Sequence, residues 1–188
     1  MNIYTRTGDR GNTGLFSGER VAKDDEKIEA YGSVDELNSI LGALAAALPP
    51  DRRALIETLR GIQAELFVVG AWMAVTPGSP AAKQIEVFED ERVAALEKHI
   101  DALQESLPTL TRFILPGGHM TSAWAHIARS VCRRAERQAV RIFRNDHAAA
   151  RDRVHETILS YLNRLSDYLF VLARYCNQIQ GESDIEWR

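Results

Sequence analysis

The sequence has few cysteines, no strong excess of one charge and no long apolar run, and each shortage excludes a class of protein. Cys132 and Cys176 form no CxxC pair, which argues against a cysteine zinc site and a disulfide framework. The net charge of −3 argues against a general nucleic-acid binder, which needs a broad basic surface. The longest apolar run, residues 66–75, is too short to span a bilayer, and the polar start has no signal core. We therefore expect a soluble cytoplasmic protein with neither nucleic acid nor membrane as a partner.

The pattern of apolar residues also lacks the alternation typical of strands, and no internal repeat is evident. With 45% hydrophobic and 26% charged residues, the chain fits one globular domain over 1–188. Apolar residues recur every three or four positions in segments bounded by prolines, with a mobile connection expected over 78–87. The sequence thus predicts an all-α, up-and-down five-helix bundle with short joints, its helices at about 27–48, 51–75, 88–107, 119–145 and from near 151.

The predicted helix over 119–145 carries an unusual arginine cluster. Arg129, Arg133 and Arg137 recur at i, i+4 and i+8, so three guanidinium groups line one helical face. Cations stacked in this way repel one another unless carboxylates or a polyanion lie opposite, and arginine suits a bidentate grip on phosphate. A solvated surface face is the alternative. The Pro116-Gly117-Gly118 turn just before this helix places the charges near a shaped loop and favours a small anionic ligand.

The first 25 residues read as a glycine-rich loop, with residues 26–188 forming the helical bundle. Glycines alternate with threonines and serines over residues 5–18, and such a loop can cradle phosphate oxygens with backbone N–H groups. Lys23 adds a positive charge just beyond it. The loop lacks the GxxxxGK[ST] pattern of a P-loop, and a flexible N-terminal arm is the alternative.

Polar residues interrupt two of the apolar helical stripes. Asp35 falls within the stripe of the first helix, where a carboxylate near a buried face needs a partner. We expect Arg129 to supply it, the alternative being a solvated acid beside Glu36. In the last helix Asn163 and Asp167 share a face, either for helix–helix hydrogen bonds or for ligand contacts.

A resident metal site is not expected. A di-metal bundle needs Glu-x-x-His motifs on two helices, but the nearest analogue, residues 152–155, stands alone. His119 and His126 are not accompanied by an acid, and the sequence assigns no role to His119. Cys132 lies next to Arg133, which could lower its thiol pKa, although a buried helical thiol is the favoured reading.

Six blocks in order resemble the ATP:cob(I)alamin adenosyltransferases of the propanediol-utilisation type, over nearly the whole chain. The blocks are residues 4–11, 18–25, 32–38, 113–118, 133–137 and 162–170. The resemblance implies a five-helix homotrimer with its active sites between subunits. It also implies transfer of the 5′-deoxyadenosyl group of Mg2+-bound ATP to the Co(I) centre of cobalamin, with release of triphosphate. The implied partners are a flavoprotein reductase and a cobalamin-dependent acceptor enzyme.

The resemblance further implies individual roles. Arg129, Arg133, Asp35 and Phe113 would form the catalytic set, with Arg129 paired to Asp35 across a subunit boundary. Phe113 would pack beneath the corrin and displace its lower axial ligand. The residues implied to contact ATP are Thr5, Arg6, Thr7, Gly8, Thr13, Gly14, Lys23, Arg133, Arg134, Glu136, Arg137 and Asn163.

Two other classes of function stay open at this point. The same bundle could serve as a non-catalytic ATP sensor or corrinoid-delivery protein, or as a purely structural oligomerising protein. A sensor needs neither the corrin face nor turnover, so the joint presence of Asp35, Phe113 and Arg129 favours the enzyme.

Overall fold

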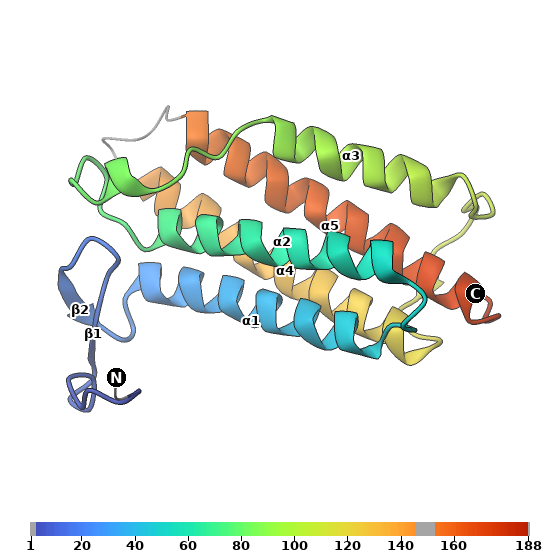
Figure 1. Ribbon diagram of the computed structural model, residues 1–188, viewed down its shortest axis with the longest axis horizontal. Coiled ribbons are helices and arrows are strands. Elements are labelled where there is room, and N and C mark those ends of the chain that lie inside the picture. The colour runs from blue at the N-terminus through green and yellow to red at the C-terminus, as the bar shows by residue number, and fades with distance from the viewer. Residues whose placement is uncertain (1–2, 146–152, 188) are drawn as a thin grey trace.

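The computed structural model describes residues 3–145 and 153–187. These residues form five long helices that run back and forth along one axis (Figure 1), which confirms the predicted all-α bundle. None of these helices combines the length and apolar character needed to cross a bilayer. The helices are α1 (Glu26–Ala47), α2 (Arg53–Met73), α3 (Glu91–Gln104), α4 (Met120–Asn145) and α5 (Arg153–Ile179).

Local chemistry sets several of the helix ends. The Asp25 side chain accepts a 2.9 Å hydrogen bond from the Lys27 backbone N–H, which caps α1. Helix α3 begins later than predicted because Phe88 lies outside it, buried edge-on against the Tyr161 ring at 5.0 Å between centroids. The predicted start of the last helix near residue 151 lies outside the described residues.

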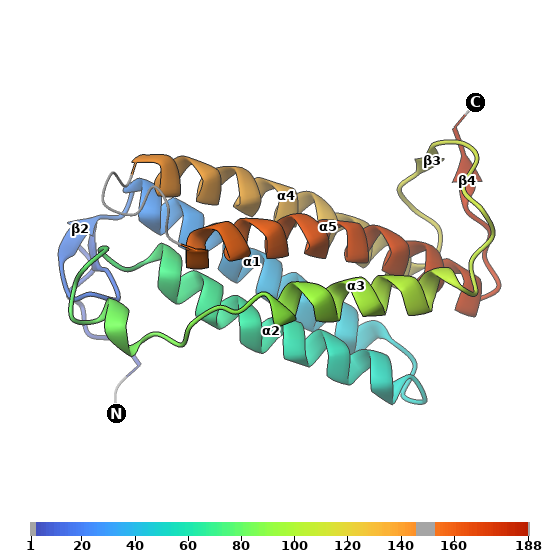
Figure 2. The ribbon, with the colours of Figure 1, turned by 90° about the horizontal axis from the view of Figure 1, so that it is seen from above.

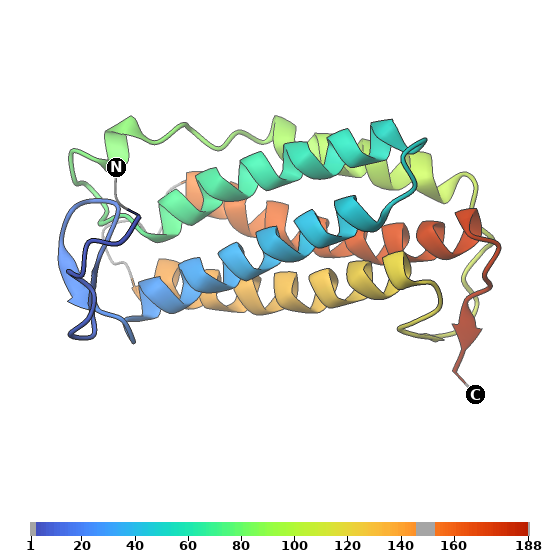
Figure 3. The same ribbon diagram turned by 60° about the horizontal axis from the view of Figure 1, so that its bottom comes forward.

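The core lies where α1 and α5 pack on α4. Helix α1 sits between α2 and α4, while α5 contacts both α4 and α3, an arrangement that Figure 3 shows from the side of α1 and α4. The buried face of α4 is lined with small residues, so its neighbours can approach closely. The alanines of this face that are wholly inaccessible are Ala125, Ala128, Ala135 and Ala139.

Two connections are longer than the short joints expected from the sequence. Residues 74–90 link α2 to α3 and include the 3-10 turn η1 (Ala82–Gln84). Part of this segment, expected to be a mobile connection, is tied to the bundle: Ile85 is buried, and Trp72 Nε1 donates a 3.0 Å hydrogen bond to the Glu86 carbonyl. Residues 105–119 link α3 to α4.

Two small antiparallel ribbons stand at opposite ends of the bundle (Figure 2). Strands β1 (Asn12–Gly14) and β2 (Arg20–Ala22) form the first, and β3 (Ile114–Leu115) and β4 (Ile185–Glu186) form the second. Strands of two or three residues are too short to show an alternating pattern, which is why the sequence did not reveal them.

Candidate active site

The N-terminal loop folds onto the ribbon formed by β1 and β2. Gly11 and Gly18 have φ of 80° and 97°, a left-handed conformation that glycine adopts without steric cost. Arg6 also has a positive φ of 58°. The hydroxyl oxygens of Thr5 and Thr7 lie 2.8 Å apart. The start of the loop therefore places two hydroxyls and a guanidinium in a sharply turned backbone.

Hydrogen bonds from Arg20 of β2 and from Lys23, directly after this strand, hold the loop in place. Arg20 donates to the Thr7 carbonyl at 2.6 Å, and the Lys23 backbone N–H donates to the Gly11 carbonyl at 2.8 Å. The Lys23 ammonium lies close to Gly8, because a Cβ built on that glycine would be 3.4 Å from Nζ. The expected glycines and lysine are thus brought together.

Thr13 and Gly14, the remaining predicted loop residues, lie in β1 at the edge of a hollow. Side chains of α1 and α2, including Tyr31 and Phe67, form the opposite part of its wall. A second hollow beside the hairpin has carboxylates of Glu19, Asp25 and Glu26 along it. Lys27 also lines this second hollow, and its ammonium donates to the Val75 carbonyl at 3.0 Å. The described lining of the first hollow includes no lysine or arginine.

The arginine face lies on the outer side of α4. Arg133 and Arg137 are exposed, and neither makes a hydrogen bond or ion pair within the described chain. Arg134 instead forms an ion pair with Glu36 of α1. Two guanidinium groups are therefore free to bind an anion.

Glu136 and Asn163 meet across the α4–α5 boundary beside these arginines. Asn163 Nδ2 donates to a Glu136 carboxylate oxygen at 3.2 Å, so a helix–helix hydrogen bond occupies part of the predicted ATP contact set. The Asp167 carboxylate accepts a hydrogen bond from Arg164 Nη1 at 3.0 Å. The two polar residues of the α5 stripe thus have separate partners.

Arg129 and Asp35 are not joined within the described chain. Arg129 is half-buried and its Nε lacks a partner among the described residues, while burial, and next the nearby Arg133, lower the pKa of its guanidinium. Asp35 is exposed, whereas Val34 and Leu37 form the buried stripe of α1. The expectation of an acid near a buried face was therefore wrong, and Asp35 is exposed beside Glu36, as in the alternative.

Phe113 stands at the other end of the bundle with its side chain 79% exposed. Its ring meets Trp187 edge-on at 6.5 Å between centroids, and the Trp187 backbone N–H donates to the Phe113 carbonyl at 2.8 Å. Sequence reasoning missed Trp187. The sequence does contain a hint of this contact: Ile185 and Trp187 are two apolar residues, spaced as in a strand, in an otherwise polar C-terminal segment.

The three groups of predicted residues do not meet within the described chain. The N-terminal loop and the Phe113 ribbon lie at opposite ends (Figure 2). Among the described residues, no hydrogen bond or ion pair links residues 3–23 to α4 or α5. A single chain therefore presents separate parts of a site.

The described part of the chain contains no cluster of side chains that could bind a metal ion by itself. No three His, Cys, Asp or Glu side chains there are grouped so that they could hold one. Glu136, the carboxylate nearest the arginine pair in sequence, is already hydrogen-bonded to Asn163. Within residues 3–145 and 153–187 the protein side chains alone therefore form no cluster of this kind.

The structure is thus a helical bundle with exposed guanidinium groups on α4 and an exposed aromatic pair, Phe113 and Trp187, at one end. The chain matches the cobalamin adenosyltransferase family over residues 3–176. It is 43% identical to the corrinoid adenosyltransferase of Bacillus subtilis, over 100% of this chain and 92% of the relative. It is 45% identical to the cobalamin adenosyltransferase of Cupriavidus metallidurans, over 99% and 94%.

Solved structures agree with the sequence relatives. A variant of the PduO-type ATP:corrinoid adenosyltransferase from Lactobacillus reuteri, complexed with cobalamin and ATP, superimposes with a TM-score of 0.89 at 34% identity. The superposition covers 100% of this chain and 99% of that one. The chain belongs to the cobalamin adenosyltransferase family. The resemblance, the enzyme class and the ATP:corrinoid adenosyltransferase activity expected from the sequence are confirmed.

Both thiols are expected to be inert in the folded protein. Cys132 and Cys176 are free and buried; burial raises the pKa of Cys132 above its usual range and that of Cys176 to about 11. Because the thiolate is the reactive form, iodoacetamide at pH 8 should label neither residue in the native protein and both in guanidinium chloride, as measured by mass spectrometry. Rapid native labelling of Cys132 would contradict this expectation.

Proposed function

We propose that the chain transfers the 5′-deoxyadenosyl group of ATP to the Co(I) centre of a corrinoid and releases triphosphate, at sites formed between subunits. The observation that carries the proposal is the pair of exposed arginines, Arg133 and Arg137, without protein partners in the described chain. The family relatives support the reaction. The residue roles that follow belong to the same proposal.

The arginine face binds the triphosphate. Arg133 and Arg137 make charge-assisted hydrogen bonds to phosphate oxygens, and Arg134 joins them by exchanging Glu36 for phosphate. Glu136 and Asn163 border the nucleotide as a hydrogen-bonded pair. Fixed cations stabilise the charge that develops on the departing triphosphate more strongly in a water-poor site than in bulk water.

The N-terminal loop closes over the nucleotide from a second subunit. Its hydroxyls, backbone N–H groups and Lys23 ammonium suit phosphate and ribose oxygens. The proposed contacts from this segment are Thr5, Arg6, Thr7, Gly8, Thr13, Gly14 and Lys23. Magnesium enters as part of the nucleotide substrate, held by its phosphates, as is common for this ion.

Phe113 forms the corrinoid side of the site. An apolar ring occupies the lower face of the corrin without coordinating cobalt, and this displaces the lower ligand and makes reduction to Co(I) easier. The Co(I) of the substrate is the nucleophile, so the chain needs no catalytic serine, cysteine or histidine. The protein aligns the two substrates, and orientation of this kind contributes up to about 7–11 kcal/mol.

A homotrimer brings the parts together. One protomer holds the loop and the arginine face apart, so a site that uses both requires a neighbouring copy. The exposed Asp35 and the half-buried Arg129 with its free Nε complement each other across such a boundary. We further propose a cytoplasmic setting, in keeping with two free thiols, with a flavoprotein reductase and a cobalamin-dependent acceptor enzyme as partners.

The reaction is tested with chemically generated cob(I)alamin and Mg-ATP under anaerobic conditions. Loss of the Co(I) absorbance should accompany equal amounts of adenosylcobalamin and triphosphate, measured by chromatography. ATP binding without either product would identify a sensor or a corrinoid-delivery protein instead. Absence of ATP binding would leave a structural oligomer.

Replacing Arg133 should weaken ATP binding. Arg133→Ala removes a charge-assisted phosphate bond, worth about 1.5–3 kcal/mol or roughly a tenfold to hundredfold rise in Kd. Isothermal titration calorimetry measures the change. Arg144→Ala, in the last turn of the same helix, is the matched control and should leave the Kd unchanged. An unaltered Kd in Arg133→Ala would contradict the proposed nucleotide site.

Reversing the charges of Asp35 and Arg129 should test the subunit boundary. Asp35→Arg and Arg129→Asp should each weaken subunit association by about 2–5 kcal/mol, because each leaves like charges facing one another. The double reversal should restore the assembly, as measured by sedimentation velocity. Glu105→Arg, on the end of α3, controls for net charge. Failure of the double variant to recover while both single variants stay folded would disprove the pairing.

A further inference from the structure

We infer that Arg174 is a positioning residue for the corrinoid side of the site: through its ion pair with Asp184 it holds the Phe113 loop and the C-terminal tail in one arrangement. The inference rests on the proposed function, which places the corrinoid against Phe113. The loop is residues 105–119, and the tail is residues 180–187. Neither the arginine cluster of α4 nor the N-terminal loop takes part.

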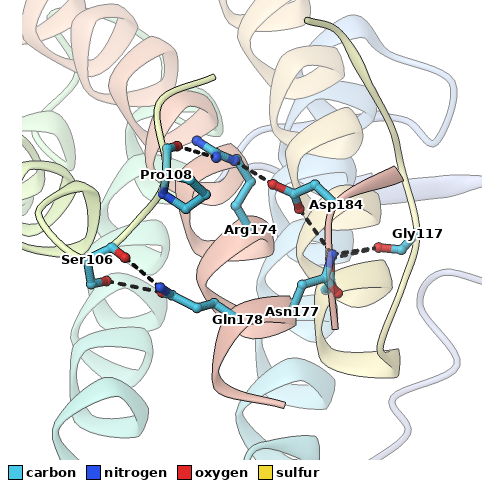
Figure 4. Close-up of polar contacts among 8 residues, drawn as sticks. Ser106, Pro108, Gly117, Arg174, Asn177, Gln178 and Asp184 are labelled. Atoms are coloured by element: carbon cyan, nitrogen blue, oxygen red, sulfur yellow. Dashed lines mark hydrogen bonds and ion pairs between the residues drawn. The ribbon is translucent and has the colours of Figure 1, made fainter. Parts of the chain in front are cut away.

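Arg174 is a buried cation with two partners from different parts of the chain. Its side chain is 7% exposed, Nε donates to Asp184 at 2.7 Å, and Nη2 donates to the Pro108 carbonyl at 2.7 Å (Figure 4). A buried charge is costly unless it is paired and hydrogen-bonded. The planar guanidinium therefore fixes Pro108 and Asp184 relative to each other, a geometry that the single ammonium of lysine cannot reproduce.

Asn177, one turn further along α5, holds the other end of the loop. Its Oδ1 accepts from the His119 backbone N–H at 3.0 Å, and its Nδ2 donates to the Gly117 carbonyl at 3.2 Å. The same Nδ2 donates to Asp184 at 3.3 Å (Figure 4). Asp184 thus links Arg174 to Asn177, and through them both ends of the loop.

Gly118 makes this close approach possible. Its φ is +98°, and a Cβ added there would lie 2.3 Å from Asn177 Oδ1, so any side chain would collide.

Gln178 donates to the Ser106 carbonyl, which fixes the start of the loop. Three residues on one end of α5 therefore hold the loop at 106, 108 and 117–119, and Phe113 projects from the stretch between.

The same ion pair fixes the tail that pairs with this stretch. Asp184 directly precedes β4, and β4 pairs with β3 beside Phe113. The exposed ion pair of Arg112 with Glu186, at 3.5 Å and with side chains 64% and 53% exposed, also spans the ribbon, but such pairs contribute little. The buried pair of Arg174 is the one that can order both strands before the corrinoid arrives, and a preordered surface binds without an ordering cost.

The experiment compares steady-state kinetics of the full chain with cob(I)alamin and ATP varied separately. Arg174→Gln should raise the KM for cob(I)alamin about tenfold, the effect of losing one hydrogen bond to a charge, and change the KM for ATP less than about twofold. Asp184→Asn should act in the same direction, and Arg174→Lys should recover only part of the loss. Arg60→Gln, which breaks an exposed ion pair with Glu57 within α2, is the control and should behave as wild type.

The outcomes separate this inference from the proposed function. A wild-type chain that forms no adenosylcobalamin refutes the proposed function itself. An active wild type with an unchanged corrinoid KM in the folded variants overturns the inference alone, as does an equal rise in both KM values. If Arg174→Gln does not fold, Asp184→Asn carries the test, since Asp184 lies in the tail outside the helical core.

Discussion

The packing of α4 against α1 and α5 is the interaction on which the rest of the structure depends. Alanines on its inner face let both neighbours approach closely, and the same helix must turn a charged face outward because its residues repeat with the helical period. Polar contacts, such as the ion pair of Glu36 with Arg134, lie along the boundary between α1 and α4. Burial of one side of α4 thus fixes where the arginines of the other side stand, and the proposed nucleotide site inherits its geometry from the core.

The helices could be predicted from the sequence because their apolar residues keep the helical period over many turns and prolines bound them. The exceptions have physical causes. Phe88 fits the helical pattern, yet its ring is buried against Tyr161 before α3 begins. The strands near Ile114 and Ile185 are two residues each, and pairing between segments so distant in sequence leaves no local pattern to read.

The sequence predicts individual site residues, whereas their spatial arrangement in one chain is visible only in the structure. Helical spacing identified the arginine face, and the family resemblance identified Phe113. The placement of the loop away from that face depends on the tertiary fold. The sequence placed Asp35 within the apolar stripe of the first helix because helical periodicity alone does not locate the edge of a buried face. In the structure Asp35 is exposed, while its neighbour Val34 is buried. Arg174 and Asp184 raised no signal, since an isolated arginine in α5 and an acid in the tail meet only after the tail folds back on α5.

The exposure of Phe113 has a thermodynamic consequence for substrate capture. A ring that is 79% accessible keeps its hydration shell until a ligand covers it, and the loss of such a shell lowers the heat capacity of the complex. Under the proposed function, corrinoid binding becomes steadily more exothermic on warming, while the binding of ATP to the charged face lacks this temperature signature. The two substrates would then differ in how their affinities respond to temperature, although they meet in one site.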